Sequence, residues 1–216
     1  MSEPTHKRKK GRPLGAEAEV GREAVLLAAR DVLRETPPGQ VTRQLVATKA
    51  GVDPGLIRYY FGTLENLMAE VAATVNRDLR AQVEGAQAGR SPDERLLLRV
   101  AGTFQMFLEN PHHHEVMLSH QLGARTDEIK ADWRHHLGGS LVDLKDILVS
   151  GREAGELREI DERLLHLAII SLGEFFSTSE TLLKDMYGDD ATIEDLRDPY
   201  LRFVEDLLLN GLRPRA

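Results

Sequence analysis

The chain contains no cysteine among its 216 residues. Disulfides, thiolate metal sites and cysteine nucleophiles are therefore excluded. Long apolar runs are also missing, because the most apolar stretch, residues 164–176, is interrupted by His166, Gly173 and Glu174. That stretch is too short and too polar to span a bilayer. The basic N-terminus is not followed by an apolar segment, as a secretory signal requires. We therefore expect a cytoplasmic protein.

Several chemical and structural signatures are absent as well. The sequence has no glycine-rich phosphate loop, no GxSxG elbow and no HExxH motif, and so we expect neither an enzyme nor a cofactor. No stretch alternates apolar and polar residues between turns, which excludes a predicted sheet. Aromatic residues are scarce, whereas Leu, Ala, Glu and Arg are abundant. These residues lose little side-chain freedom in a helix. The composition therefore predicts an all-α fold.

Charge is distributed unevenly along the chain. The net charge is −7, yet residues 1–62 carry 11 Lys and Arg against 7 Asp and Glu. The remainder is strongly acidic. Phosphate binding needs positive charge only on the contacting face, and an acidic body reduces indiscriminate binding. The asymmetry indicates a basic, polyanion-binding N-terminal part on an acidic body.

Apolar periodicity and capping signals predict nine helices. Helix starts are indicated at Thr42, at Asp53 with Pro54, at Thr63, and at Ser91 with Pro92. Gly51 and Gly62 supply turns. The expected helices span residues 20–35, 42–49, 54–60, 63–85, 93–109, 112–122, 126–154, 161–186 and 192–211.

Residues 42–61, TRQLVATKAGVDPGLIRYYF, hold the motif most informative about function. Two short helices joined at Gly51 would share a small core and present polar groups outward. The expected core residues are Leu45, Val46, Ala50, Val52 and Ile57, and the expected outer residues are Arg43, Gln44, Leu56, Arg58, Tyr59 and Tyr60. A capped helix that exposes guanidinium and phenol groups suits insertion into a major groove. The spacing alone leaves open an ordinary helical hairpin with a solvated face.

This segment resembles the DNA-binding region of the TetR family of bacterial regulators. The matching residues are Thr42, Val46, Ala47, Ala50, Gly51, Val52, Gly55, Ile57, Tyr60, Phe61 and Leu67. Two positions depart from the family pattern. Arg58 stands where the family usually has Tyr, which alters the expected sequence preference because Arg can read a guanine edge. Leu64 replaces a common Lys and removes one phosphate contact, which Thr63 at a helix N-terminus can partly replace.

The resemblance implies which residues face DNA. They are Thr42, Arg43, Gln44, Gly55, Tyr59, Tyr60 and Thr63. Arg58 and Arg43 are the expected specificity residues, with Tyr60, Thr42 and Thr63 as phosphate anchors. In the basic arm, residues 1–19, Lys9, Lys10 and Arg12 are candidates for a minor-groove contact. A solvated tail is the open alternative. The expected DNA-binding domain spans residues 20–66.

The remaining residues, 67–216, are expected to form a helical effector-binding and dimerisation domain. Helices 161–186 and 192–211 carry apolar residues too widely distributed for one buried stripe each. The TetR family dimerises through its last two long helices, and the layout here is similar. By the same analogy, an unknown small-molecule effector would bind between helices 93–109, 126–154 and 161–186. Its candidate contacts, each also suited to plain core packing, are Phe104, Phe107, Met117, Trp133, Leu137, Leu141 and Phe175.

Three consecutive histidines, His112–His114, invite a metal hypothesis, with His120, His135 and His136 elsewhere. Successive helical residues point about 100° apart, so the three cannot easily share one ion. We therefore expect no metal, and structural or pH-sensitive imidazoles instead.

Together these features predict a dimeric, ligand-responsive repressor released from a palindromic operator by its effector. An activator on the same fold is one alternative. The other is a helical ligand-binding or scaffold protein that has lost DNA binding, for which Leu64 is the best support.

Overall fold

The computed structural model describes the backbone of residues 15–123 and 127–214, and the side chains of residues 21–119 and 137–214. The regular elements of these residues are all helical, which confirms the predicted fold class. They are α1 (Gly15–Glu35), the 3₁₀ turn η1 (Pro38–Gln40), α2 (Arg43–Ala50), α3 (Gly55–Phe61), α4 (Leu64–Ala86), α5 (Pro92–Glu109), α6 (His113–Gly123), α7 (Asp127–Glu153), α8 (Glu162–Ser177), α9 (Glu180–Tyr187) and α10 (Ile193–Leu212).

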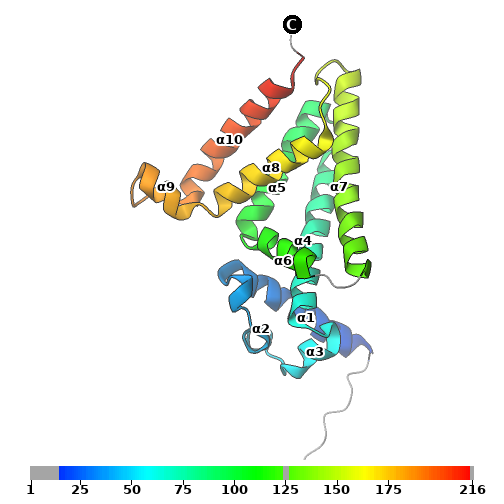
Figure 1. Cartoon of the computed structure of the whole chain (residues 1–216), viewed down its shortest axis with the longest axis vertical. Coiled ribbons are helices and arrows are strands. Elements are labelled where there is room, and N and C mark those ends of the chain that lie inside the picture. Colours follow the sequence, from blue (N-terminus) through cyan, green and yellow to red (C-terminus); the bar gives the residue numbers. More distant parts are fainter. Residues whose placement is uncertain (1–14, 124–126, 215–216) are drawn as a thin grey trace, which may run out of the picture.

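The molecule has a small head and a larger body, joined by α4 (Figure 1). The head consists of α1, α2, α3 and the first turns of α4. Its core is built on one face of α1, where Val25, Ala29 and Val32 are buried against Ile57 of α3 and Leu67 of α4. Apolar residues at helical spacing on α1 and α4 therefore provide the surface on which the short helices α2 and α3 pack.

The body is organised around α5, which packs against α4, α7, α8 and α10. Its central residues Leu96, Val100 and Phe104 are almost completely buried, with Leu144 of α7 and Ile169 of α8. The ring of Tyr200 on α10 stacks on Phe176 of α8 with centroids 4.4 Å apart. This stacking and the Tyr200 hydroxyl, which donates to the Leu172 carbonyl at 3.4 Å, hold α10 on α8. α4, α7, α8 and α10 thus pack directly on α5, and α6 packs on α4 and α7.

The joint between head and body is packed. The head core continues through Val71 and Val75 of α4 into Phe107 and Val116, without a break in buried contacts. Arg30 of α1 donates to Asp78 of α4 at 2.9 Å and to Asn110, the C-cap of α5, at 3.3 Å. The expected boundary at residue 66 therefore marks no gap in packing.

Two sequence-based boundaries need correction. The first helix begins at Gly15, so residues 15–19 belong to it and not to the arm. The single helix expected over residues 161–186 is broken between α8 and α9. Ser177 and Thr178 hydroxyls donate to the Glu174 carbonyl, and the Ser179 hydroxyl donates to that of Phe175. Consecutive hydroxyls that bond back to the preceding turn compete with the helical backbone ladder and end α8.

Across the described residues, no helix has both the length and the apolar character needed to cross a bilayer.

Candidate nucleic-acid interface

Side-chain caps and a glycine fix the geometry of α2, α3 and the start of α4. The Thr42 hydroxyl accepts the Leu45 N–H at 3.2 Å, and Gly51 ends α2 with φ 66°, a left-handed conformation that favours glycine. Asp53 Oδ1 then accepts the Gly55 N–H at 2.7 Å as α3 begins. Thr63 caps α4 by accepting the Asn66 N–H at 3.1 Å. The expected start signals are therefore used, and they set α2 and α3 as a compact helix-turn-helix.

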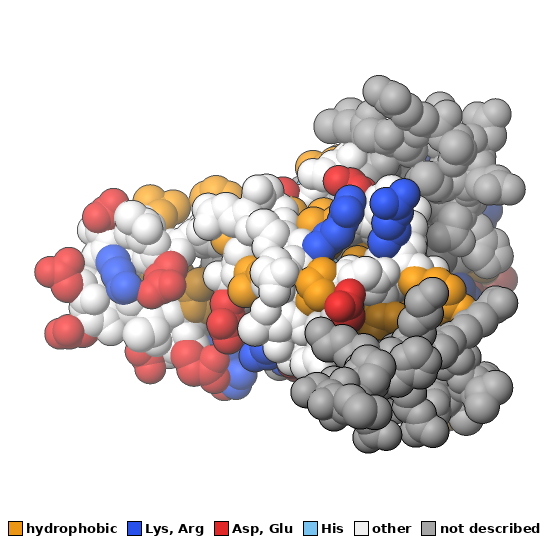
Figure 2. Space-filling model, turned by 90° about the horizontal axis from the view of Figure 1, so that it is seen from below, with side chains coloured by type: hydrophobic (Ala, Val, Ile, Leu, Met, Phe, Trp, Pro, Cys, Tyr) orange, Lys and Arg blue, Asp and Glu red, His pale blue; other side chains and the backbone are white. Residues whose placement is uncertain are grey.

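Most of the predicted DNA-facing side chains lie at the surface of this head. They are Thr42, Arg43, Gln44, Gly55, Arg58, Tyr59 and Thr63. Tyr59 is 52% exposed, whereas Ile57 and Phe61 of the same helix are buried. Figure 2 views this end of the molecule and shows Lys and Arg side chains among hydrophobic ones, with most carboxylates towards the α9 side at the left. α3 therefore buries one face and presents guanidinium and phenol groups on the other.

Two expectations about this surface were wrong in part. Tyr60 is half-buried, not outward-facing: it packs on the head core, and its hydroxyl lies 3.0 Å from where a Cβ at Gly21 would stand. Leu45, expected in the core, is 40% exposed. α2 is only eight residues long and buries Val46 and Ala47, so the preceding position turns to solvent.

Arg22 of α1 contacts both α4 and α3, and it was not identified from the sequence. Its Nη2 donates to both carboxylate oxygens of Glu70 on α4, at 2.5 and 2.6 Å. Its guanidinium carbon lies 4.9 Å from the Phe61 ring centroid. One side chain thus ties α1 to α4 and covers the end of α3. The Arg22–Glu70 spacing of 48 residues carries no local sequence signal.

The arm residues Lys9, Lys10 and Arg12 lie outside the described residues.

The predicted effector contacts are not gathered around one cavity. Phe104 belongs to the body core, but Phe107 and Met117 are buried in the core that joins head and body. Leu137 and Leu141 are half-buried, and the Trp133 side chain lies outside the described residues. Phe175, also predicted as a pocket contact, is 62% exposed, because α8 buries Leu165, Ile169 and Phe176 and position 175 falls outside that face.

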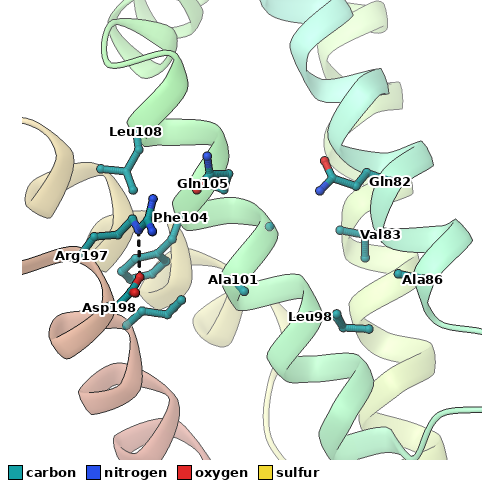
Figure 3. A pocket seen from close by; sticks show the side chains of 12 residues that line it. Gln82, Val83, Ala86, Leu98, Ala101, Phe104, Gln105, Leu108, Arg197 and Asp198 are labelled. Carbon is teal, nitrogen blue, oxygen red and sulfur yellow. Dashed lines mark hydrogen bonds and ion pairs between the residues drawn. The ribbon is translucent and has the colours of Figure 1, made fainter. Parts of the chain in front are cut away.

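A groove of about 320 Å³ lies instead on the opposite side of α5. Figure 3 shows its two walls, with Gln82, Val83 and Ala86 of α4 on one side and Arg197 and Asp198 of α10 on the other. α5 forms the floor, and Phe104 is the one predicted contact that lines it. Arg197 pairs with its neighbour Asp198 at 2.9 Å on the α10 wall.

The clustered histidines have separate environments. His112 approaches Glu115 at 3.4 Å, and His114 contacts Glu174 of α8. His113 is buried against the Phe107 ring, and burial, with smaller contributions from His114 and Arg30, lowers its pKa to about 4. In the described part of the chain no three His, Asp or Glu side chains are placed to hold a metal ion. His120, His135 and His136 have no described side chains.

A capped helix-turn-helix head on an all-helical body defines a helical DNA-binding regulator of transcription. Residues 92–208, more than half of the chain, match the sequence model of the family described as tetracyclin repressor-like, C-terminal domain. The chain therefore belongs to the TetR family of transcriptional regulators.

Individual relatives agree with this assignment. The chain is 25% identical to the HTH-type transcriptional repressor NicS of Pseudomonas putida over 172 residues, which cover 78% of this chain and 81% of NicS. A TetR-family regulatory protein from Rhodococcus RHA1 has a TM-score of 0.68 at 20% identity and covers 91% of this chain and 98% of its own. The Bacillus subtilis regulator FadR, solved in complex with stearoyl-CoA, has a TM-score of 0.59 at 22% identity over 83% of this chain and 95% of its own. The two structural matches support the fold.

Proposed function

We propose that the protein is a homodimer that represses transcription from a palindromic operator and leaves it when a small-molecule effector binds the body. The exposed face of α3, with Arg58 and Tyr59 outward and Ile57 and Phe61 buried, is the observation that carries this proposal. A hairpin with a merely solvated face needs no basic and aromatic side chains there. The protein acts in the cytoplasm and is not an enzyme.

Each side chain of the face has a proposed role. Arg58 and Arg43 read base edges in the major groove, as guanidinium groups do with guanine. Thr42 and Thr63, at the starts of α2 and α4, hold phosphates together with free backbone N–H groups of the same turns. Tyr60 is proposed to donate its hydroxyl to a phosphate at the edge of this surface, although the residue is half-buried and its hydroxyl lies against Gly21. Gln44, Gly55 and Tyr59 complete the surface, and Lys9, Lys10 and Arg12 add a minor-groove contact.

Leu64 bears on the alternative that DNA binding has been lost. It is half-buried and packs on the head core, so the residue that replaces the family's common Lys contributes to the packing of α4. Thr63, which precedes Leu64 in the chain, and Thr42 at the start of α2 are both exposed. We therefore favour DNA binding over a scaffold function.

Dimerisation is supported by apolar surface on the last helices. Among the described residues, Leu164, Leu167 and Phe175 of α8 and Phe203 and Leu207 of α10 are all more than half exposed. Spacings of three and eight residues on α8 and of four on α10 place those of each helix on one face. Exposed apolar faces of this kind mark association surfaces, and the occupant proposed is a second copy of the chain. Met186 and Tyr187 of α9 extend the exposed apolar surface.

The effector is proposed to bind between α5, α7 and α8 and to act through the packed joint. α4 connects this body to the reading head, and α6 packs against α4 and α7. A ligand that favours one arrangement of these helices changes the spacing of the two heads, and thereby operator affinity.

A mobility-shift titration with genomic DNA fragments at two salt concentrations tests the proposal. A regulator should retain a subset of fragments at the higher salt concentration, while binding to bulk DNA falls steeply. Uniform binding, or no binding at either concentration, would support the scaffold alternative instead.

A further inference from the structure

Arg99 is a buried cation at the centre of the body. It lies in the middle of α5 and is only 9% exposed. Its Nη2 donates to the Ser140 carbonyl at 3.0 Å and to the Ser140 hydroxyl at 2.6 Å, both on α7. The same nitrogen lies 3.4 Å from His166 Nδ1 on α8. Three helices thus converge on one guanidinium, at the place where the effector is proposed to bind.

The charge of Arg99 has no counter-ion in the described part of the chain. The nearest carboxylate that acts on it, Asp143, is paired with Arg80 at 3.2 Å. His166 supplies no negative charge, and burial together with Arg99 lowers the pKa of its imidazole to about 4. Among the described residues, Nε and Nη1 of Arg99 make no hydrogen bond. Burial without an ion pair is costly for a guanidinium, because water no longer solvates its charge.

Arg95, one turn earlier on the same helix, shows how a partly buried arginine is usually paired with a carboxylate. Its Nη2 donates to Asp146 at 2.6 Å, its Nη1 to Ser150 at 3.3 Å and its Nε to Gln87 at 3.2 Å. Every nitrogen of Arg95 is engaged, whereas Arg99 uses one of three. Packing of α5 on α7 therefore does not explain why Arg99 lacks an anion.

We propose that Arg99, Ser140 and His166 form the anchor of the effector site, and that the effector is a small organic carboxylate with a mainly apolar body. This rests on the proposed function, since it names the chemistry of the effector. The free Nε and Nη1 donors of the guanidinium suit a carboxylate. The Ser140 hydroxyl, which accepts from Arg99, still has its own hydrogen to donate.

The charges and apolar residues near Arg99 favour a ligand with one negative charge and an apolar body over a phosphate. One guanidinium and a neutral imidazole balance a single negative charge, whereas a phosphate monoester carries more at neutral pH. Val100, Leu144 and Ile169, each within a turn of an anchor residue, are at most 1% exposed. Leu137 and Leu141, on either side of Ser140, are half-buried. The anchor residues are therefore flanked by aliphatic residues along all three helices.

Calorimetric titration of the full-length protein with acid and amide pairs tests this assignment. Hexanoate, benzoate and phenylacetate are each compared with hexanamide, benzamide and phenylacetamide, which keep the shape and lose the charge. We expect acids to bind and their amides to bind at least tenfold more weakly. R99M should weaken acid binding roughly tenfold to a hundredfold, the range for a charge-assisted hydrogen bond. R95M is the matched control and should bind as the wild type does.

Three results would overturn the proposal: no acid binds the wild type, acids and amides bind equally, or R99M binds acids as the wild type does. R99K serves as a second variant in case R99M does not fold. It keeps the charge and should bind acids with intermediate affinity. The pKa of His166, followed by NMR, should rise when benzoate neutralises Arg99. Operator binding is measured separately without acids. Loss of DNA binding with retained, Arg99-dependent acid binding would contradict the proposed function and leave the anchor standing.

Discussion

At the scale of single residues, burial separates the side chains proposed to contact DNA from those that hold the head together. Ile57 and Arg58 are neighbours on α3, yet the first is fully buried and the second exposed. Tyr59 is likewise exposed, whereas Tyr60 beside it is half-buried. Successive residues of a helix point about 100° apart, so only those that face α1 and α4 are buried. The role of each α3 side chain can therefore be tested with a single substitution.

Replacing Arg58 by Ala should weaken operator binding by about 1–3 kcal/mol, the cost of losing a base contact, and relax preference at one base pair of each half-site. Fluorescence anisotropy with the operator and its single-base variants measures both effects. Arg152, at the far end of α7, is the control, because R152A removes the same charge away from the head. Equal losses in the two variants would point to net charge alone.

His113 should make stability depend on pH. Its folded-state pKa of about 4 lies below the ordinary value of 6.5, so the unfolded chain binds a proton more readily. Stability is then lost as pH falls from about 6.5 towards 4, with a slope that approaches about 1.4 kcal/mol per pH unit. Urea unfolding at pH 7, 6 and 5 tests this, and H113Q should have a slope smaller by one proton. An unchanged slope in H113Q would contradict the assignment.

At the scale of elements, the sequence predicted the helices well and their side-chain environments less well. Caps such as Thr42, Thr63 and Ser91 act within three or four residues, so their effect is readable from the chain. The break after Ser177 was missed although three consecutive hydroxyl residues mark it, because the apolar pattern runs through into α9. The exposure of Phe175 and the isolation of Arg99 depend on how α5, α7 and α8 are rotated against one another. That rotation is set by long-range packing and leaves no local pattern.

The threonine caps allow a matched comparison. Thr63 and Thr192 each accept a main-chain N–H three residues on, both at 3.1 Å, at the starts of α4 and α10. T63A and T192A should each lower the free energy of unfolding by about 1 kcal/mol. T63A alone should also weaken operator binding, since Thr63 is the cap proposed to hold a phosphate. Chemical denaturation and DNA titration of both variants measure this, and equal DNA affinity would remove Thr63 from the interface.

At the scale of the whole molecule, the proposed function requires two heads held at a fixed spacing. The exposed apolar faces of α8 and α10 lie on the body, away from the head (Figure 1). A dimer formed there leaves both heads free to contact DNA. Because α4 belongs to head and body alike, a change around α5 reaches the head through packed side chains and not through a flexible linker.

Placing a charge on that face should separate the subunits. Phe203 is 61% exposed on α10, and F203D would bury a carboxylate in the proposed interface. We expect a monomer in sedimentation equilibrium, with folding retained by circular dichroism and operator affinity greatly reduced. Val142, equally exposed on α7, is the control, and V142D should remain dimeric. A dimer in F203D would place the interface elsewhere.

Selection of bound DNA from a random pool, by the wild type and by R58A in parallel, tests the central claim most directly. The account predicts that the wild type enriches inverted repeats whose half-sites are centred about 34–36 Å apart or a multiple of that distance. R58A should enrich repeats that are relaxed at one position of each half-site. Enrichment of single, unpaired sites, or the same sequences with both proteins, would contradict a paired reading head centred on Arg58.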